Sequence, residues 1–354
     1  MPAHGIVCGQ ILDQLAHPSP ELESEMRRRG PNEGVDIVDR GRGHARKRNA
    51  RVEKVRRPST VELMLLVTVS IWAFNFSVTR YALTNGWEPL AFSSIRYSAG
   101  ALLFAAFTYS TERSLRIGGR RDLVLLLAAA GFGIWLNQIA YVYAIKLTTA
   151  STVALILGIT PIFAALGAFA VGLERMSRRF WIAAIVSFGG VGLVALGSGG
   201  GVAIDLTGNL LAVATAATWA AYSIVITPLM RRYSPYRISA IVLLLGCVPL
   251  VLTALRQLFD QDFGALGALP WAAIVFATLG PLVVTNVLWF RSVSIVGPSR
   301  ATLFANIQPF IAVVLAVLIL SERITMLQVA GGVLIALGIV LVRRRRASVV
   351  APSE

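Results

Sequence analysis

A single arginine inside an apolar stretch is the residue of this sequence best suited to bind a ligand. Arg96 is the only charged residue between positions 89 and 110, and it lies about 10 Å along a helix that begins at Pro89. Inside a membrane a guanidinium costs about 2.5 kcal/mol or more, so it should face the protein interior or a water-filled cavity. There it can hold a carboxylate or another anionic group through two hydrogen bonds. The alternative is a structural partner, either helix-end carbonyl groups or an acid such as Glu88.

Polar and aromatic side chains recur at helical spacing in five other apolar stretches. Residues three or four apart share one face of a helix, so each group presents its amides, hydroxyls or rings together. Such faces would line a pathway for a solute; the alternatives are hydrogen bonds between helices and aromatic belts at a membrane surface. The groups are Trp72, Asn75 and Thr79; Gln138 and Tyr141; Trp219 and Tyr222; Asn286 and Trp289; and Thr302 and Asn306.

The placement of the titratable residues argues against an enzyme. All three histidines (His4, His17 and His44) precede the apolar runs, and no Asp or Glu lies near the middle of a run. A catalytic constellation of Ser with His, paired acids or a metal cluster therefore cannot be assembled, and we expect neither a cofactor nor a metal. Cys8 and Cys247 indicate no disulfide framework.

The same placement narrows the expected mode of energy coupling. A proton-coupled carrier usually has a buried carboxylate or histidine near its centre. We therefore expect a uniporter, an exchanger, or a carrier whose coupling proton rides on the substrate or on a peripheral acid. The peripheral candidates are Glu62, Glu88, Glu174 and Glu322.

The composition places the apolar stretches in a membrane. Of 354 residues, 56% are hydrophobic and 14% charged, against about 25% charged in soluble domains. The net charge of +15 comes from arginines clustered in short breaks between apolar runs, a pattern of membrane topology and not of specific nucleic-acid binding. Residues 1–57 lack an apolar period and are predicted to form a disordered, basic cytoplasmic tail, unless the protein begins at Met26.

Ten apolar segments follow the tail, most of them about 20 residues long, as a spanning helix requires. The predicted spans are residues 61–82, 89–110, 122–144, 149–172, 178–197, 207–229, 236–257, 270–291, 299–320 and 325–342. With the tail inside, Lys and Arg gather in alternate connections on the cytoplasmic side. We therefore predict an all-α, multi-pass protein of the cytoplasmic (inner) membrane with both termini, including residues 344–354, in the cytoplasm.

A duplicated stretch divides these spans into halves. In each copy a proline stands thirteen residues before a Glu-Arg pair: Pro161 before Glu174 and Arg175, and Pro309 before Glu322 and Arg323. A shift of 148 residues superposes the two copies, and a shift of 147 aligns Trp72 with Trp219. Because each half has five spans, the second copy is expected upside down, the architecture in which alternating access works by rocking one half against the other.

The repeated prolines and charge pairs have two interpretations each. A proline inside a span removes a backbone donor and kinks the helix, so Pro161 and Pro309 are candidate hinges or structural kinks. The pairs Glu174–Arg175 and Glu322–Arg323 lie at helix ends, where an ion pair within the helix or across a loop is favoured over gating.

The first span head WAFNFSVTRYAL, the segments FSSIRYSAGALL and YAIKLTTAS, and the TP…LER and QP…SER spans resemble the EamA family of the drug/metabolite transporter superfamily. The resemblance implies two EamA repeats, at 61–197 and 207–343, and a ten-helix carrier with a central cavity between them. The long tail departs from the family, and no charge in the seventh span answers Arg96.

The function expected from this resemblance is secondary transport of a small organic metabolite. An amino acid or related compound moved outward is the first reading, and efflux of multiple drugs or toxic compounds is the alternative. The alternatives to transport are a membrane-embedded enzyme and a regulatory membrane protein that acts through its tail. The expected partners are a small-molecule substrate and the lipid bilayer, and the glycine-rich fifth and tenth spans leave a homodimer open.

Overall fold

The structure is a computed structural model that describes residues 60–172, 176–198, 202–297, 301 and 304–343. The predictions made for the basic tail, for Glu174 and Arg175, for Thr302 and for residues 344–354 lie outside these ranges. Within them the chain is helical and contains no strand. The all-α class predicted from the sequence is therefore confirmed.

The helices of the first half follow the predicted spans closely. They are α3 (Thr60–Thr84), α4 (Pro89–Glu112), α5 (Arg120–Ala130), the π-helix η1 (Gly131–Leu136), α6 (Asn137–Leu147), α7 (Ala150–Leu157), α8 (Thr160–Ala170) and α9 (Arg178–Leu196). Segments α5, η1 and α6 form one continuous apolar rod over Arg120–Leu147. Helices α7 and α8 together make an apolar segment over Ala150–Ala170 that is interrupted at Gly158 and Ile159.

The second half repeats this order. It comprises α10 (Val202–Ile226), the short 3-10 helix η2 (Leu229–Arg231), α11 (Pro235–Asp260), α12 (Ala268–Thr278), the π-helix η3 (Leu279–Val284), α13 (Thr285–Val296), α15 (Gln308–Leu320) and α16 (Met326–Arg343). Polar N-caps and prolines fix several helix starts: the Ser177 and Ser234 hydroxyls accept hydrogen bonds from the backbone N–H groups of Phe180 and Arg237, respectively.

Eight helices of the described chain are long and apolar enough to cross a membrane. The ninth and tenth predicted spans contain shorter apolar helices, Gln308–Leu320 and Met326–Leu341. The ninth is short because the chain turns at Asn306 and Ile307 before α15 begins. The structure thus shows a multi-pass helical membrane protein, and the count of ten spans stays a prediction.

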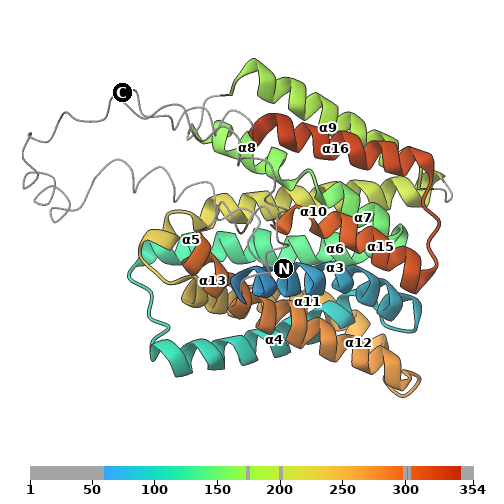
Figure 1. The fold of residues 1–354 in the computed structure, drawn as a ribbon. Helices are drawn as coiled ribbons and strands as arrows, with labels where there is room; N and C mark the ends of the chain where they lie inside the picture. Colours follow the sequence, from blue (N-terminus) through green and yellow to red (C-terminus); the bar gives the residue numbers. More distant parts are fainter. Residues whose placement is uncertain (1–59, 173–175, 199–201, 298–300, 302–303, 344–354) are drawn as a thin grey trace, which may run out of the picture.

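Helices from the two halves pack in matching pairs. The fifth predicted span, α9, packs along the tenth, α16, and α4 packs along α11 (Figure 1). Helix α3 packs on α15, as α10 packs on α8. Each contact has its counterpart when the halves are exchanged, which is the packing expected of a duplicated unit.

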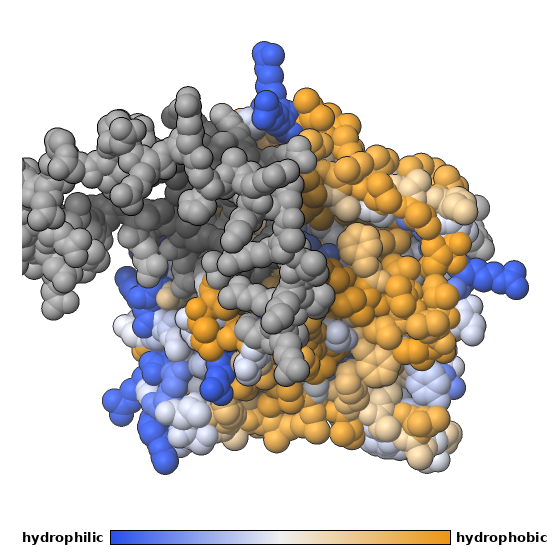
Figure 2. Space-filling view, viewed as in Figure 1, coloured by the Kyte–Doolittle hydropathy of each residue, from blue (hydrophilic) through white to orange (hydrophobic). Residues whose placement is uncertain are grey.

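The outside of the bundle is largely apolar. Figure 2 shows hydrophilic residues mainly at the edges of the molecule and a broad hydrophobic surface between them. Across the described chain, large apolar side chains such as Ile185, Leu252 and Leu318 are each more than half exposed. Such a surface is stable in the hydrocarbon of a bilayer and not in water.

Two π-helical turns occupy equivalent places in the halves. Segment η1 begins at Gly131 and η3 at Leu279, 148 residues apart, the same shift that relates Pro161 to Pro309. Each turn is followed directly by two buried polar residues, Asn137 with Gln138 and Thr285 with Asn286. Single π-helical turns often occur at functional sites, and here each directly precedes a pair of buried polar side chains.

Glycines allow the close approach of α9 and α16. A Cβ atom added to Gly190 would lie 2.6 Å from the Gly331 carbonyl oxygen, and one added to Gly331 would lie 2.4 Å from the Gly190 oxygen. These glycines thus serve a contact within one chain, and the homodimer stays a prediction.

We expect Gly331→Ala to lower the free energy of unfolding by about 1–3 kcal/mol, because the added methyl meets backbone and α9 must move. Thermal unfolding of the purified protein in detergent would measure the loss. The matched control is Gly189→Ala on α9, where no atom lies within 4 Å of the added Cβ. Equal melting temperatures for the two variants would contradict this packing.

Candidate functional site

The two spans that carry the repeated prolines are both broken just before the proline. Helix α7 ends at Leu157, the chain turns through Gly158 and Ile159, and α8 starts at Thr160. The second copy turns at Asn306 and Ile307, and α15 starts at Gln308. In each case the proline is in the first turn of the new helix, where its missing N–H costs nothing.

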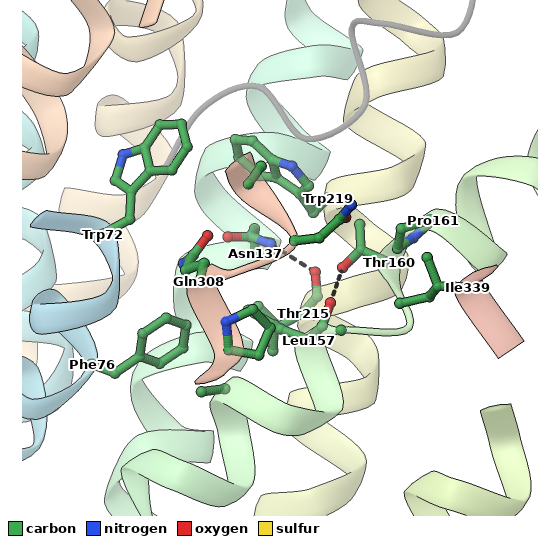
Figure 3. Close-up of a pocket in the computed structure, with 15 residues that line it drawn as sticks. Trp72, Phe76, Asn137, Leu157, Thr160, Pro161, Thr215, Trp219, Gln308 and Ile339 are labelled. Atoms are coloured by element: carbon green, nitrogen blue, oxygen red, sulfur yellow. Dashed lines mark hydrogen bonds between the residues drawn. The ribbon is translucent and has the colours of Figure 1, made fainter. Parts of the chain in front are cut away.

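A cavity of about 80 Å³, termed the central chamber, lies between these breaks. Figure 3 shows side chains from several helices around this space. The lining residues are Trp72, Phe76, Asn137, Ala154, Leu157, Gly158, Thr160, Pro161, Thr215, Trp219, Ala305, Asn306, Gln308, Pro309 and Ile339. Many are partners under the shift that relates the halves, including Trp72 with Trp219 and Pro161 with Pro309, so the chamber lies where the halves meet.

The polar groups of the chamber are neutral. The chamber has amides and hydroxyls from Asn137, Thr160, Thr215, Asn306 and Gln308, and none of the described residues that line it carries a formal charge. The first turns of α8 and α15 also border it. The amino-terminal end of a helix carries a partial positive charge and attracts anionic groups, so the chamber favours the negative part of a ligand.

A chain of hydrogen bonds leads from the chamber into the first half. The Asn137 amide donates to the Thr215 carbonyl oxygen (2.9 Å) and to the Thr218 hydroxyl (3.1 Å), both on α10. The Gln138 amide donates to the Asn137 side-chain oxygen over 3.1 Å. Because Asn137 and Thr215 belong to different halves, this chain joins them at the chamber wall.

Arg96 stands at the end of this chain and does not line the chamber. Its Nη2 donates to the Gln138 side-chain oxygen at 2.7 Å, and its Nη1 contacts the Asn75 oxygen at 3.4 Å. The guanidinium lies 5.0–5.8 Å from the ring centroids of Phe92, Tyr97 and Tyr141, within cation–π range.

The described surroundings of Arg96 use only part of its hydrogen-bonding capacity. The residue is 1% exposed, and its Nε has no hydrogen-bond partner within the described structure. The alternative acid Glu88 lies instead 3.5 Å from Lys146 near the surface. Arg96 is thus held by amides and aromatic rings, without a carboxylate in contact among the described residues.

The other site residues predicted from the sequence lie around the central chamber and Arg96. Trp72, Trp219 and Asn306 line the chamber, while Asn75 and Tyr141 belong with Gln138 to the surroundings of Arg96 and are joined by a 3.2 Å hydrogen bond. Tyr222 packs on Trp219, and Trp289 on Trp72, with centroids 4.9 and 5.1 Å apart. Asn286 donates to the Leu282 carbonyl oxygen of its own helix, and its side-chain oxygen has no partner in the described chain.

Four polar residues of the chamber were not predicted: Asn137, Thr160, Thr215 and Gln308. Thr160 and Gln308 immediately precede the repeated prolines, so the prolines themselves were a usable signal. Asn137 lies next to Gln138, and helical spacing assigns neighbours to different faces. Both are buried directly after a π-helical turn.

Glu322 joins the halves at one end of the bundle. Its carboxylate accepts hydrogen bonds from the backbone N–H groups of Ala150 (2.8 Å) and Ser151 (3.0 Å) and from the Ser151 hydroxyl (2.5 Å). It therefore caps the start of α7 in the other half, while Arg323 beside it is exposed. The negative charge of this carboxylate is also stabilised by the partial positive charge at the amino-terminal end of α7.

A second tie between the halves lies at the opposite end (Figure 1). The Asp122 carboxylate at the start of α5 accepts a hydrogen bond from the Tyr233 hydroxyl at 2.7 Å and lies 3.2 Å from Arg232. Arg237 on α11 lies 3.1 Å from Glu112 on α4. The chamber is thus flanked by polar contacts between the halves at both ends.

A duplicated bundle of apolar helices with a polar chamber between its halves defines a membrane transport protein. The model of the EamA-like transporter family matches the chain twice, at residues 59–196 and 206–344. The chain belongs to the EamA-like transporter family.

Several proteins named as transporters are similar to this chain. A probable terminal-alkyne amino-acid exporter of Streptantibioticus cattleyicolor is 26% identical over 79% of this chain and 92% of its own length. The uncharacterized transporter YetK of Bacillus subtilis is 24% identical over 65% of this chain and 71% of its own. A crystal structure covering 81% of this chain, at 18% identity, superposes with a TM-score of 0.55 and shares the fold.

Proposed function

We propose that this protein is a secondary transporter that exports a small organic metabolite, such as an amino acid or related compound, by alternating access at the central chamber. The observation that carries the proposal is the position of the chamber, which borders both broken spans and is lined from both halves. In transporters built from inverted repeats, substrates bind at such a place because broken helices expose backbone groups and helix ends there.

The chemistry of the chamber suits an amino acid. The first turns of α8 and α15 favour a carboxylate, and the oxygens of Asn137, Thr215 and Gln308 can accept hydrogen bonds from an ammonium group. Arg96 contributes through Gln138 and Asn137, whose amides it orients. The printed name of the Streptantibioticus relative, an amino-acid exporter, supports the same class.

Our proposed topology has ten spans in two inverted repeats, with both termini in the cytoplasm. Basic residues favour the cytoplasmic side of bacterial and other membranes, and Arg113, Arg120 and Arg232 lie at the same end of the bundle as the Asp122 tie. The Glu322 end is then the outer end. Broken spans at Pro161 and Pro309 provide the candidate hinges between the halves.

Our proposed mechanism does not use a central acid. No carboxylate lines the chamber among the described residues, which favours uniport, exchange, or a proton carried by the substrate. The peripheral acid Glu322 accepts three hydrogen bonds from the start of α7 in this conformation.

Efflux of multiple toxic compounds is the second candidate. Trp72, Trp219 and Phe76 give the chamber broad aromatic walls, and such walls bind many flat apolar molecules. A multidrug carrier should move structurally unrelated cations and dyes, whereas a metabolite exporter should not. A membrane-embedded enzyme or a tail-driven regulator has no comparable feature in its favour.

Metabolite profiling of cells and medium tests the proposal. Overproduction of the native protein should raise one or a few amino-acid-like solutes in the medium. Asn137→Leu should lower this efflux about tenfold, because losing a buried hydrogen bond of about 1–2 kcal/mol weakens the chamber wall. Asn85→Leu, at an exposed helix end, should leave it unchanged. If the native protein alters no solute, or the two variants behave alike, the assignment is wrong.

A further inference from the structure

A second cavity, termed the side chamber, adjoins the central chamber between α7, α15 and α16. It has a volume of about 420 Å³. Its lining residues are Leu155, Gly158, Asn306, Pro309, Phe310, Gly332, Ile335, Ala336, Ile339 and Val340. Gly158, Asn306, Pro309 and Ile339 also line the central chamber, so the two spaces meet at the helix breaks.

The two chambers differ in chemistry. Among the described residues, the central chamber has five amide or hydroxyl side chains, whereas Asn306, on the shared wall, is the only polar side chain that lines the side chamber. The inner wall is buried, with Ile335 at 3% exposure. The rim reaches the lipid-facing surface at Phe310 and Val340, which are 51% and 46% exposed.

The two chambers differ in volume, and this difference indicates different roles. Sites for small organic molecules usually have volumes of roughly 300–1,000 Å³. The side chamber, at about 420 Å³, falls within this range, and the central chamber, at about 80 Å³, does not. In this conformation the central chamber can therefore hold a polar head group, and the apolar remainder of a molecule needs the adjoining space.

We infer that the side chamber binds the apolar side chain of the transported molecule, so that the substrate class is an amphipathic amino acid with an extended alkyl or aryl side chain. The inference rests on the proposed function, since it assumes that the central chamber holds the amino-acid head. Burying each further methylene group should strengthen binding about fourfold, so transport should favour long side chains over short ones. A hydrocarbon chain of a membrane lipid is the other source of the same chemistry.

The test is counterflow into proteoliposomes containing the purified full-length protein, with straight-chain 2-amino acids from alanine to 2-aminooctanoic acid as probes. Ala336→Phe places a ring in the side chamber and should lower transport of 2-aminooctanoic acid about tenfold or more, with little effect on alanine. The matched control is Ala330→Phe on the same helix, where the side chain is exposed; it should keep the native profile. Ala336→Leu, a smaller change, should give the same trend if the Phe variant fails to fold.

The outcomes separate two failures. If Ala336→Phe, Ala336→Leu and Ala330→Phe all keep the native preference for chain length, the side chamber does not hold the substrate, and the inference is overturned. If the native protein prefers no length, the inference is also overturned while the transport proposal stands. If the native protein moves no member of the series, the proposed function itself fails.

Discussion

Replacing Arg96 by alanine is expected to reduce transport about a hundredfold or more. The guanidinium donates to Gln138 and contacts Asn75, and Gln138 in turn donates to Asn137 at the chamber wall. Hydrogen bonds to charged groups contribute about 1.5–3 kcal/mol each, and removal of Arg96 leaves the Gln138 oxygen without its donor. The amides that face the substrate then lose their fixed orientation.

The measurement is the initial rate of solute efflux for protein reconstituted at equal density. Arg96→Lys keeps the charge but cannot contact both amides with a planar group, so it should recover only part of the rate. Arg116→Ala removes an exposed arginine and serves as the matched control. Melting temperatures separate a loss of function from a loss of fold. Native rates in a folded Arg96→Ala protein would show that the arginine has no part in the site.

Replacing Glu322 by alanine is expected to open the chamber toward the Glu322 end. In this conformation the carboxylate accepts three hydrogen bonds from Ala150 and Ser151 across the two halves. Losing charge-assisted bonds of about 1.5–3 kcal/mol each should shift the conformational equilibrium at least about tenfold toward the state in which this contact is broken. Glu322→Gln keeps an acceptor but loses the charge, and should fall between alanine and the native residue.

A cysteine at Ala154 reports this shift, because Ala154 lines the chamber one turn from Ser151. The background replaces Cys8 and Cys247 with serine. A membrane-impermeant thiol reagent, added from the Glu322 side, should label Ala154→Cys faster when Glu322 is also alanine. Arg323→Ala, at the exposed neighbouring position, should leave the rate unchanged. Equal labelling rates in the two backgrounds would mean that the Glu322 contact does not close the chamber.

The apolar helices and the repeat were predictable from the sequence for simple physical reasons. A hydrocarbon environment requires long apolar runs, and a proline inside one marks a break wherever it occurs. The burial of Arg96 followed from the cost of exposing a charge to lipid. The breaks before Pro161 and Pro309 lie within one turn of the predicted kinks.

The contacts between the two halves could not be predicted from the sequence. Glu322 was expected to form an ion pair within its helix or across a loop, whereas its partners are backbone N–H groups of α7, 172 and 171 residues away in the chain. For Arg96 the sequence left open a substrate anion, helix-end carbonyl groups or an acid such as Glu88, and it did not predict the contacts with the amides of Gln138 and Asn75. Such partners depend on how helices pack, which apolar periodicity does not encode.

The π-helical turns escaped prediction for a related reason. A turn with one extra residue rotates all later side chains around the helix, and nothing in GFGIWL or LGPLVV marks that rotation. Ordinary helical spacing groups Gln138 with Tyr141 and assigns Asn137 to a different face, so it does not predict Asn137 as a chamber residue. Because the 148-residue shift relates the two π-helical turns, the position of one turn predicts the position of the other.

Counterflow by the native protein tests the central claim most directly. Proteoliposomes preloaded with an excess of one unlabelled amino acid are diluted into a trace of the same amino acid in labelled form, for each of a panel. Alternating access at the central chamber predicts transient, saturable accumulation of label for at least one amino acid, reduced about tenfold by Asn137→Leu. Label that never exceeds the level in protein-free vesicles, for every member of the panel, would contradict the account.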